Sequence, residues 1–239
     1  MNIELTPFLG GKLKVYQPKK GFRFGIDSVI LAYFLKLKPF QKILEVGAGS
    51  GIISLIALTR FSRCKIWALE REPIFIECLK KNVLLNNFKE RFFIITGDFS
   101  LPPFKFESFD VLFSNPPYFE AGRGRESPYE EKNRACREKN LDLEGFIKKT
   151  SQLLKNRGNL FLVFTAYRMA ELIYLLKKYR LEPKTLRLVH SYPGEEARLV
   201  LIRAVKNGGQ ELRIFPPLYI YQEPKGDYTE EIKNFLFPS

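Results

Sequence analysis

Two short motifs in a fixed order constrain this chain more than any other feature. Residues 45–51 read EVGAGSG after an apolar run, and residues 114–118 read SNPPY after another. Glycines at alternate positions let backbone amides approach a ligand, because no Cβ intervenes and a positive φ costs little. Asn-Pro-Pro-Tyr at the end of a strand offers fixed hydrogen-bond acceptors beside an aromatic ring. The order predicts a nucleoside-binding loop followed by a reaction site.

The Asn-Pro-Pro-Tyr motif suits chemistry on a planar nitrogen, which is a poor nucleophile because its lone pair is delocalised. The side-chain oxygen of Asn115 and the carbonyl of Pro116 can accept its two hydrogens. Pro117 helps to fix the backbone so that these acceptors need no rearrangement, and Tyr118 would stack on the flat substrate. Together the motifs resemble those of the S-adenosylmethionine-dependent methyltransferases that alkylate a planar amide or amino nitrogen. The alternative is a rigid turn without a ligand.

Short β-rich runs alternate with helical patterns, which is typical of a mainly parallel sheet covered on both faces. We expect strands at residues 42–46, 65–70, 92–96, 109–114 and 160–165. We expect helices at residues 50–61, 73–86, 143–154 and 167–179. Residues 185–190 and 198–205, joined by a turn-like segment, predict an antiparallel hairpin at the edge of the sheet. The fold class is therefore α/β.

The glycine loop would lie between the first strand and the helix after it, with its amides directed at a ligand over the helix N-terminus. The predicted contacts are Gly47, Ala48, Gly49 and Gly51. Ile52 stands where the dinucleotide fingerprint needs a third glycine, which disfavours a nicotinamide cofactor. Glycines at such turns also occur without any ligand.

Residues at the ends of the expected strands extend this site. Glu70 ends the second strand, where an acid can bind both ribose hydroxyls, or it is a surface carboxylate. Asp98 can accept from an adenine amino group and Phe99 can stack on the ring, or they are a turn residue and a core residue. Glu45 can hold the methionine end of the cofactor, or it caps the loop.

The size and composition of the chain favour one domain. With 239 residues and 45% hydrophobic content, the chain can bury one sizeable core. We expect a single domain over residues 1–239, with residues 1–40 before the first strand and residues 208–239 as a C-terminal extension. Residues 119–140 form a long polar loop beside the Asn-Pro-Pro-Tyr, so we favour a substrate lid over simple disorder.

A net charge of +13 and a pI near 9.6 attract polyanions, which makes nucleic acid the natural partner. Charge does not distinguish RNA from DNA, and a lysine-rich chain can also be merely soluble. The candidate phosphate contacts are Lys12, Lys14, Lys19, Lys20, Arg23, Lys132, Arg134, Arg137 and Lys139.

The sequence also predicts a cytoplasmic protein without a metal. No run of about 18 apolar residues is present, and residues 1–21 lack the architecture of a cleavable signal. The three cysteines are odd in number and widely spaced, which fits neither a disulfide framework nor a zinc ribbon.

Three further stretches sharpen the resemblance. Residues 22–32, FRFGIDSVILA, resemble the N-terminal segment of the family that methylates N6 of the adenine just 3′ of the anticodon in a valine tRNA. Residues 134–138, RACRE, are similar to that family's arginine-glutamate signature but depart from its Ala-Arg order. Residues 216–221 and 226–231 are similar to its C-terminal segment. The likeness covers nearly the whole chain.

The resemblance implies a Rossmann-like class I methyltransferase with a seven-stranded, mostly parallel sheet, helices on both faces and a C-terminal antiparallel hairpin. It implies that substrate and cofactor enter beside residues 1–40, with catalysis at Asn115, Pro116, Pro117 and Tyr118 and cofactor contacts at Gly47, Glu70, Asp98 and Asn115. Candidate contacts to substrate or RNA are Arg23, Asp27, Arg134, Arg137 and Glu138. An adenine must be splayed out to react, which is easier in an anticodon loop than in a duplex. The partner is then a tRNA.

Other functions remain open from sequence alone. A glutamine N5-methyltransferase of peptide release factors uses the same motif but normally carries an N-terminal helical domain, and +13 favours RNA over a protein substrate. A DNA adenine methyltransferase would need room for a target-recognition domain. A non-catalytic RNA-binding module would not need an intact Asn-Pro-Pro-Tyr. The oligomeric state is open as well.

Overall fold

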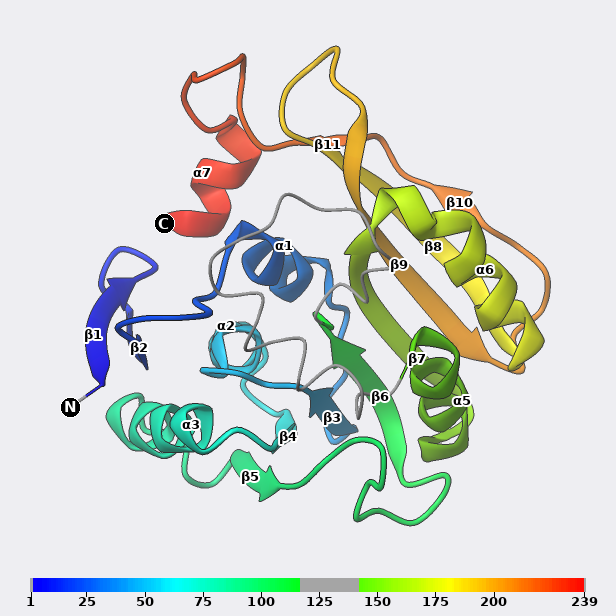
Figure 1. The fold of residues 1–239 in the computed structure, drawn as a ribbon, viewed down its shortest axis with the longest axis horizontal. Helices are drawn as coiled ribbons and strands as arrows, with labels where there is room; N and C mark the ends of the chain where they lie inside the picture. The colour runs from blue at the N-terminus through cyan, green and yellow to red at the C-terminus, as the bar shows by residue number, and fades with distance from the viewer. Residues whose placement is uncertain (1, 117–141, 239) are drawn as a thin grey trace.

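The computed structural model describes residues 2–116 and 142–238 (Figure 1). Within these residues a nine-stranded sheet has the order β10-β8-β9-β7-β6-β3-β4-β5, and β11 also pairs with β8. The strands are β3 (Lys42–Val46), β4 (Lys65–Glu70), β5 (Phe92–Thr96), β6 (Phe109–Ser114), β7 (Leu154–Thr165), β8 (Leu181–His190), β9 (Ala197–Lys206), β10 (Arg213–Ile214) and β11 (Leu218–Tyr219). Among these strands β9 alone runs antiparallel to its neighbours. The predicted α/β class with a mostly parallel sheet is confirmed.

Strands β3 to β6 begin and end where the sequence predicts, whereas β7 and β8 begin earlier than predicted. Gly158 and Pro183 conceal these early starts, because both residue types usually interrupt a strand. Each lies beside a shift in the register of its ladder, one in the pairing of β7 with β6 and one in that of β8 with β9. Strand pairing therefore overrides local propensity at both positions.

Helices cover both faces of the sheet, each over its own hydrophobic cluster (Figure 1). The helices are α1 (Ile26–Phe34), α2 (Ile52–Arg60), α3 (Pro73–Leu85), α5 (Leu143–Leu153), α6 (Met169–Lys178) and α7 (Glu230–Leu236), with a 3-10 turn η1 (Ala166–Arg168) before α6. Helices α1, α2 and α3 contribute to one cluster, and α5 and α6 to the other. Tyr33 of α1 stacks on Phe235 of α7 at 4.3 Å between ring centroids, which docks the C-terminal helix onto the first face. None of the helices in the described ranges has the length and apolar character needed to cross a membrane.

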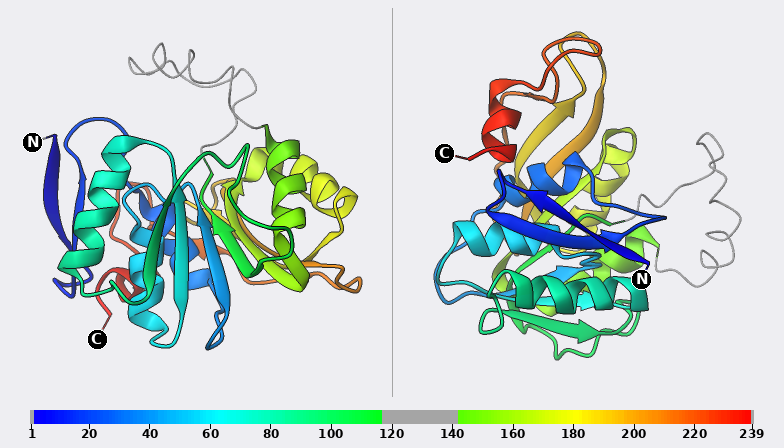
Figure 2. Two further views of the ribbon diagram at one scale, coloured as in Figure 1. Left: turned by 90° about the horizontal axis from the view of Figure 1, so that it is seen from below. Right: turned by 90° about the vertical axis from the view of Figure 1, so that its left-hand side faces the viewer.

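An N-terminal hairpin, which the sequence analysis did not predict, packs beside α3 (Figure 2). Strands β1 (Ile3–Phe8) and β2 (Leu13–Pro18) form this two-stranded sheet. Asn82 of α3 accepts from the Tyr16 amide at 2.6 Å and donates to the Tyr16 carbonyl at 2.9 Å. Asn86, one turn later, bonds Lys14 in the same way at 3.1 and 2.9 Å. Two carboxamides thus satisfy the free edge of β2 as a neighbouring strand would.

The parallel strands bring their carboxyl ends to one edge of the sheet. Residues following β3, β4, β5 and β6 therefore meet there, although they are far apart in the chain. Asn82 also donates to the carbonyl of Ser50 at 2.8 Å, so the hairpin is tied to the loop that follows β3. This edge positions the candidate site.

One carboxyl group is buried beneath that edge. Glu45 of β3 is 1% exposed, and the Ser54 hydroxyl of α2 donates to it. Burial raises the pKa of Glu45 to about 8, with a smaller upward effect from Glu70, while the bond from Ser54 opposes the rise. Glu45 therefore enters the core largely protonated at neutral pH.

This protonation predicts a pH-dependent stability. The unfolded chain releases the Glu45 proton near the ordinary value of 4.5, whereas the folded chain keeps it to about pH 8. The contribution of this group to the unfolding free energy should therefore be complete below about pH 4.5 and fall by up to about 1.4 kcal/mol per pH unit until the folded pKa is passed. Urea unfolding of the wild-type protein and of Glu45→Gln, measured from pH 5 to pH 9, checks this. Parallel pH profiles for the two proteins would contradict it.

Candidate active site

The glycine loop between β3 and α2 opens toward the carboxyl edge of the sheet. Gly47 and Gly49 have φ of 66° and 56°, and a Cβ at either position would meet nothing within 4 Å. The amides of Gly47 and Ala48 donate to the Leu69 carbonyl at 3.0 and 3.2 Å, which fixes the loop to β4. At Gly51 a Cβ would come within 2.6 Å of Leu79, so that glycine serves packing. Gly47 and Gly49 thus leave room for a ligand, as predicted for a nucleoside.

Glu70 lies at the end of β4, beside this open space. Its Oε2 accepts from the Gly49 amide at 2.7 Å, and its Oε1 accepts from the Arg71 and Glu72 amides at 2.8 and 2.9 Å. The side chain is 6% exposed, so the reading of Glu70 as a surface carboxylate is wrong. Each carboxylate oxygen can accept more than one hydrogen bond. The fixed carboxylate fits the two hydroxyls of a ribose.

Asp98 lies after β5 and is linked to the end of β4 by an ion pair. Its Oδ2 is 3.0 Å from the Arg71 guanidinium, and its Oδ1 accepts from the Ser100 amide at 2.7 Å. Burial acts to raise the pKa of Asp98, but the bonds from Ser100 and the Arg71 charge outweigh it and lower the pKa. The Phe99 ring packs against Phe146 at 5.2 Å within the second hydrophobic cluster. Asp98 is thus an ionised acceptor at the edge, and Phe99 has the core contact that was its alternative role.

Asn115 follows β6 and lies beside the start of α1. Its Nδ2 donates to Asp27 Oδ2 and to Ser28 Oγ, each at 3.0 Å. The neighbouring Ser114 hydroxyl donates to the Val46 carbonyl at 2.8 Å, and Val46 directly precedes the glycine loop. These bonds bring the second motif next to the first.

Several predicted site residues lie outside the described ranges. They are Pro117, Tyr118, Arg134, Arg137 and Glu138, together with the expected lid at residues 119–140. Pro116 is described and buried. Within the described ranges no group of three or more His, Cys, Asp and Glu side chains could hold a metal ion.

The segment between β2 and α1 forms one flank of the site. Phe22 is 64% exposed and meets Phe75 of α3 edge-on at 6.3 Å. Arg23 pairs with Glu4 of the hairpin at 2.7 Å, and both side chains remain partly exposed. Lys19 and Lys20 are exposed on the same segment. Cationic and aromatic side chains therefore stand on the chain that leads directly to Asp27.

Sequence analysis missed two residues of this arrangement. Ser28 bonds Asn115, and Arg71 bonds Asp98. Arg71 follows Glu70 directly, so its place near the cofactor loop was available from the sequence. Asp27, expected as a contact to substrate or RNA, contacts Asn115 within the protein. No local pattern signals a contact between residues 88 positions apart.

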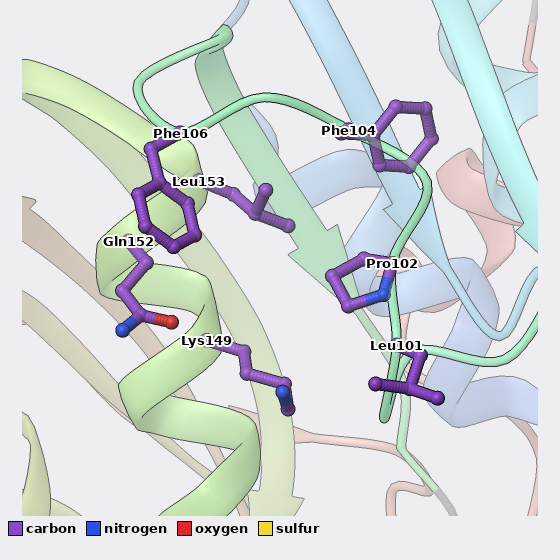
Figure 3. A pocket seen from close by; sticks show the side chains of 7 residues that line it. All are labelled: Leu101, Pro102, Phe104, Phe106, Lys149, Gln152 and Leu153. Atoms are coloured by element: carbon purple, nitrogen blue, oxygen red, sulfur yellow. The ribbon is translucent and has the colours of Figure 1, made fainter.

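A separate hollow lies between α5 and the connection from β5 to β6 (Figure 3). It measures about 250 Å³ and is lined by Leu101, Pro102, Phe104, Phe106, Lys149, Gln152 and Leu153. Phe106 and Leu153 lie close to the starts of β6 and β7, at the sheet edge opposite Asn115. None of the residues discussed above for the site lines this hollow.

Comparison with known proteins agrees with this geometry. Residues 23–180 match the methyltransferase small domain family. A Porphyromonas gingivalis protein named tRNA1(Val) (adenine(37)-N6)-methyltransferase is 30% identical over 187 residues, which cover 75% of this chain and 72% of that protein. The solved structure of a protein from Agrobacterium tumefaciens, described as a predicted O-methyltransferase, superposes with a TM-score of 0.70 at 21% identity, covering 87% of this chain and 94% of that one.

A second solved structure shows the same fold with a cofactor product bound. Geranyl diphosphate C-methyltransferase from Streptomyces coelicolor superposes with a TM-score of 0.56 at 13% identity, covering 74% of this chain and 77% of that one. It contains S-adenosyl-L-homocysteine, geranyl diphosphate and Mg2+. The Rossmann-like fold predicted from sequence is confirmed, and the chain belongs to the methyltransferase small domain family and, within it, to the family of the tRNA1(Val) (adenine(37)-N6)-methyltransferases.

Proposed function

We propose that this protein transfers a methyl group from S-adenosylmethionine to the exocyclic N6 amino group of an adenine in tRNA, the nucleotide 3′ of the anticodon of a valine tRNA. The observation that carries the proposal is Asn115 held beside the glycine loop by the bond from Ser114 to Val46. The names of the relatives supply the tRNA and the position. The charge of +13 supports a polyanionic substrate.

The described residues fit an S-adenosylmethionine that supplies an activated methyl group. The proposed cofactor-binding residues are Glu45, Gly47, Ala48, Gly49, Gly51, Glu70, Asp98, Phe99 and Asn115. Glu70 would bind the ribose and Asp98 the adenine amino group. Glu45 and Phe99 are packed beneath this surface, so we assign them support of the loop and of Asp98.

The proposed catalytic residues are Asn115, Pro116, Pro117 and Tyr118. Asn115 Oδ1 and the Pro116 carbonyl would accept the two hydrogens of the target N6. Accepting both hydrogens localises the nitrogen lone pair, and acceptors that are already in place need no rearrangement during the reaction. Catalysis then consists mainly of alignment, since the methyl group is already activated.

The RNA would approach along the segment that precedes α1. Lys19, Lys20 and Arg23 would contact phosphates, and the exposed Phe22 offers a ring on which an unpaired base can stack. Arg134, Arg137 and Glu138 remain proposed contacts from the loop at residues 119–140, which we propose as a lid over the substrate. We further propose one methyltransferase domain over residues 1–239, acting in the cytoplasm.

A direct assay tests the function. The purified protein is incubated with labelled S-adenosylmethionine and unmodified total tRNA, with a release factor in parallel, and the RNA is digested to nucleosides. Labelled N6-methyladenosine in the tRNA is the expected result. Label in the release factor alone would instead identify a glutamine N5-methyltransferase, and label in neither would refute the proposed reaction.

The substitution Asn115→Ala should remove methyl transfer and leave cofactor binding nearly intact. Loss of a positioned acceptor lowers kcat by about 10²-fold or more. Steady-state kinetics and calorimetric titration with S-adenosylmethionine measure the two quantities separately. A large loss of cofactor affinity with unchanged kcat would show that Asn115 has a different role.

The double substitution Lys19→Glu and Lys20→Glu should raise the KM for tRNA by about tenfold or more and reduce the salt dependence of binding by about two phosphate contacts. The affinity for S-adenosylmethionine should stay unchanged. The matched control is Lys89→Glu with Lys105→Glu, which makes the same change of charge at exposed positions just before β5 and β6. Equal effects of the two pairs would mean that net charge, and not this segment, holds the RNA.

A further inference from the structure

The side-chain amide of Asn115 is bonded on one side only. Both bonds that its Nδ2 donates, to Asp27 Oδ2 and Ser28 Oγ, end on the first turn of α1 at 3.0 Å. A carboxylate can only accept a hydrogen bond, so the group that faces Asp27 must be the NH2 and not the carbonyl. Asn115 Oδ1 is therefore directed away from α1.

The two acceptors are themselves fixed. Asp27 Oδ1 accepts from the Ser28 amide at 2.9 Å, and Ser28 is buried. The residues that follow, Val29 to Ala32, lie in the core against α2, so the first turn of α1 cannot shift without disturbing the core. The start of a helix also favours a negative charge, which keeps Asp27 an acceptor. Asn115 is thus held by a rigid element.

We propose that Asp27 and Ser28 are positioning residues for methyl transfer, which hold the Asn115 amide so that its Oδ1 accepts a hydrogen from the target nitrogen. The proposal rests on the proposed function and deepens it. Without these two bonds the amide could rotate and present its NH2 to the substrate. A donor at that place would repel the N–H of the substrate instead of accepting it.

Asp27 also has an electrostatic part in this arrangement. Its negative charge polarises the Asn115 amide, and hydrogen bonds in series strengthen one another. In the transfer, the target nitrogen lone pair forms the new N–C bond and the electron pair of the broken S–C bond stays on sulfur. The nitrogen carries a positive charge until it releases one of its two protons to water. A carboxylate one amide away stabilises that charge as it develops.

Variants of Asp27 and Ser28 test the proposal through the split between kcat and KM. Asp27→Ala should lower kcat by about 10²-fold, while the KM for tRNA and the Kd for S-adenosylmethionine change less than about threefold. Asp27→Asn keeps one acceptor for Asn115 and should restore about tenfold of that loss. Ser28→Ala removes the neutral acceptor and should lower kcat by about tenfold.

The matched control is Asp110→Asn. Asp110 lies at the other end of β6, where it accepts from the Lys42 amide and pairs with Lys155, both at 2.8 Å. The variant makes the same change of charge on the same strand and should leave kcat within about twofold. Asp27→Ala with unchanged kcat and a raised Kd for S-adenosylmethionine would overturn the proposal in favour of a cofactor contact. Asp27→Asn as inactive as Asp27→Ala would refute the acceptor role.

A readout without substrate separates this proposal from the proposed function. Hydrogen exchange of the Asn115 Nδ2 hydrogens, followed by NMR, should be slow in the wild-type protein and about tenfold faster in Asp27→Ala and Ser28→Ala. Equal exchange in all three proteins would overturn the arrangement even if the tRNA is methylated. Slow wild-type exchange without tRNA methylation would refute the function and leave the arrangement standing.

Discussion

The pairing of β3 with β6 determines where chemistry can occur in this protein. Leu44 lies opposite Leu112 and Glu45 opposite Phe113, so the two parallel strands end side by side. The residue after β3 opens the glycine loop, and the residue after β6 is Asn115. The Ser114 hydroxyl, bonded to the Val46 carbonyl, closes the junction just beyond the last ladder pair. One strand pairing therefore converts two distant motifs into one site.

Helices then fix the parts that the sheet only brings together. The first turn of α1 orients Asn115 through Asp27 and Ser28. Asn82 of α3 bonds the Tyr16 backbone and the Ser50 carbonyl, which connects the N-terminal hairpin to the start of α2. In both cases a side chain satisfies groups on another element that would otherwise lack a partner, and buried polar groups must be satisfied. The site is rigid because its polar groups bond to elements anchored in the core.

The sequence predicted those parts of the fold that repeat a local pattern. The strands at residues 42–46 and 109–114 were predicted correctly because each is an apolar run that ends at a motif. The N-terminal hairpin was missed, although Gly10 and Gly11 separate two runs with partial alternation, because Pro7 interrupts the first run. The cofactor loop was predicted because its glycines are adjacent in the chain. The bond from Asn115 to Asp27 was not, because only the packing of α1 against α2 and β7 brings them together.

Negative charge at the site is balanced in four different ways. Glu45 is neutral because burial raises its pKa to about 8. Glu70 is held by three backbone amides, and Asp98 by Arg71 and the Ser100 amide. Asp27 accepts hydrogen bonds from Asn115 and the Ser28 amide.

This balance matters because the protein carries a net charge of +13, and its proposed partner is a polyanion. Four uncompensated carboxylates at the carboxyl edge would repel phosphates at the place where the target base must enter. Amide bonds, protonation and one arginine reduce that repulsion while keeping acceptors for hydroxyl and amino groups. The same acidic residues can therefore serve a nucleoside cofactor without opposing the approach of RNA.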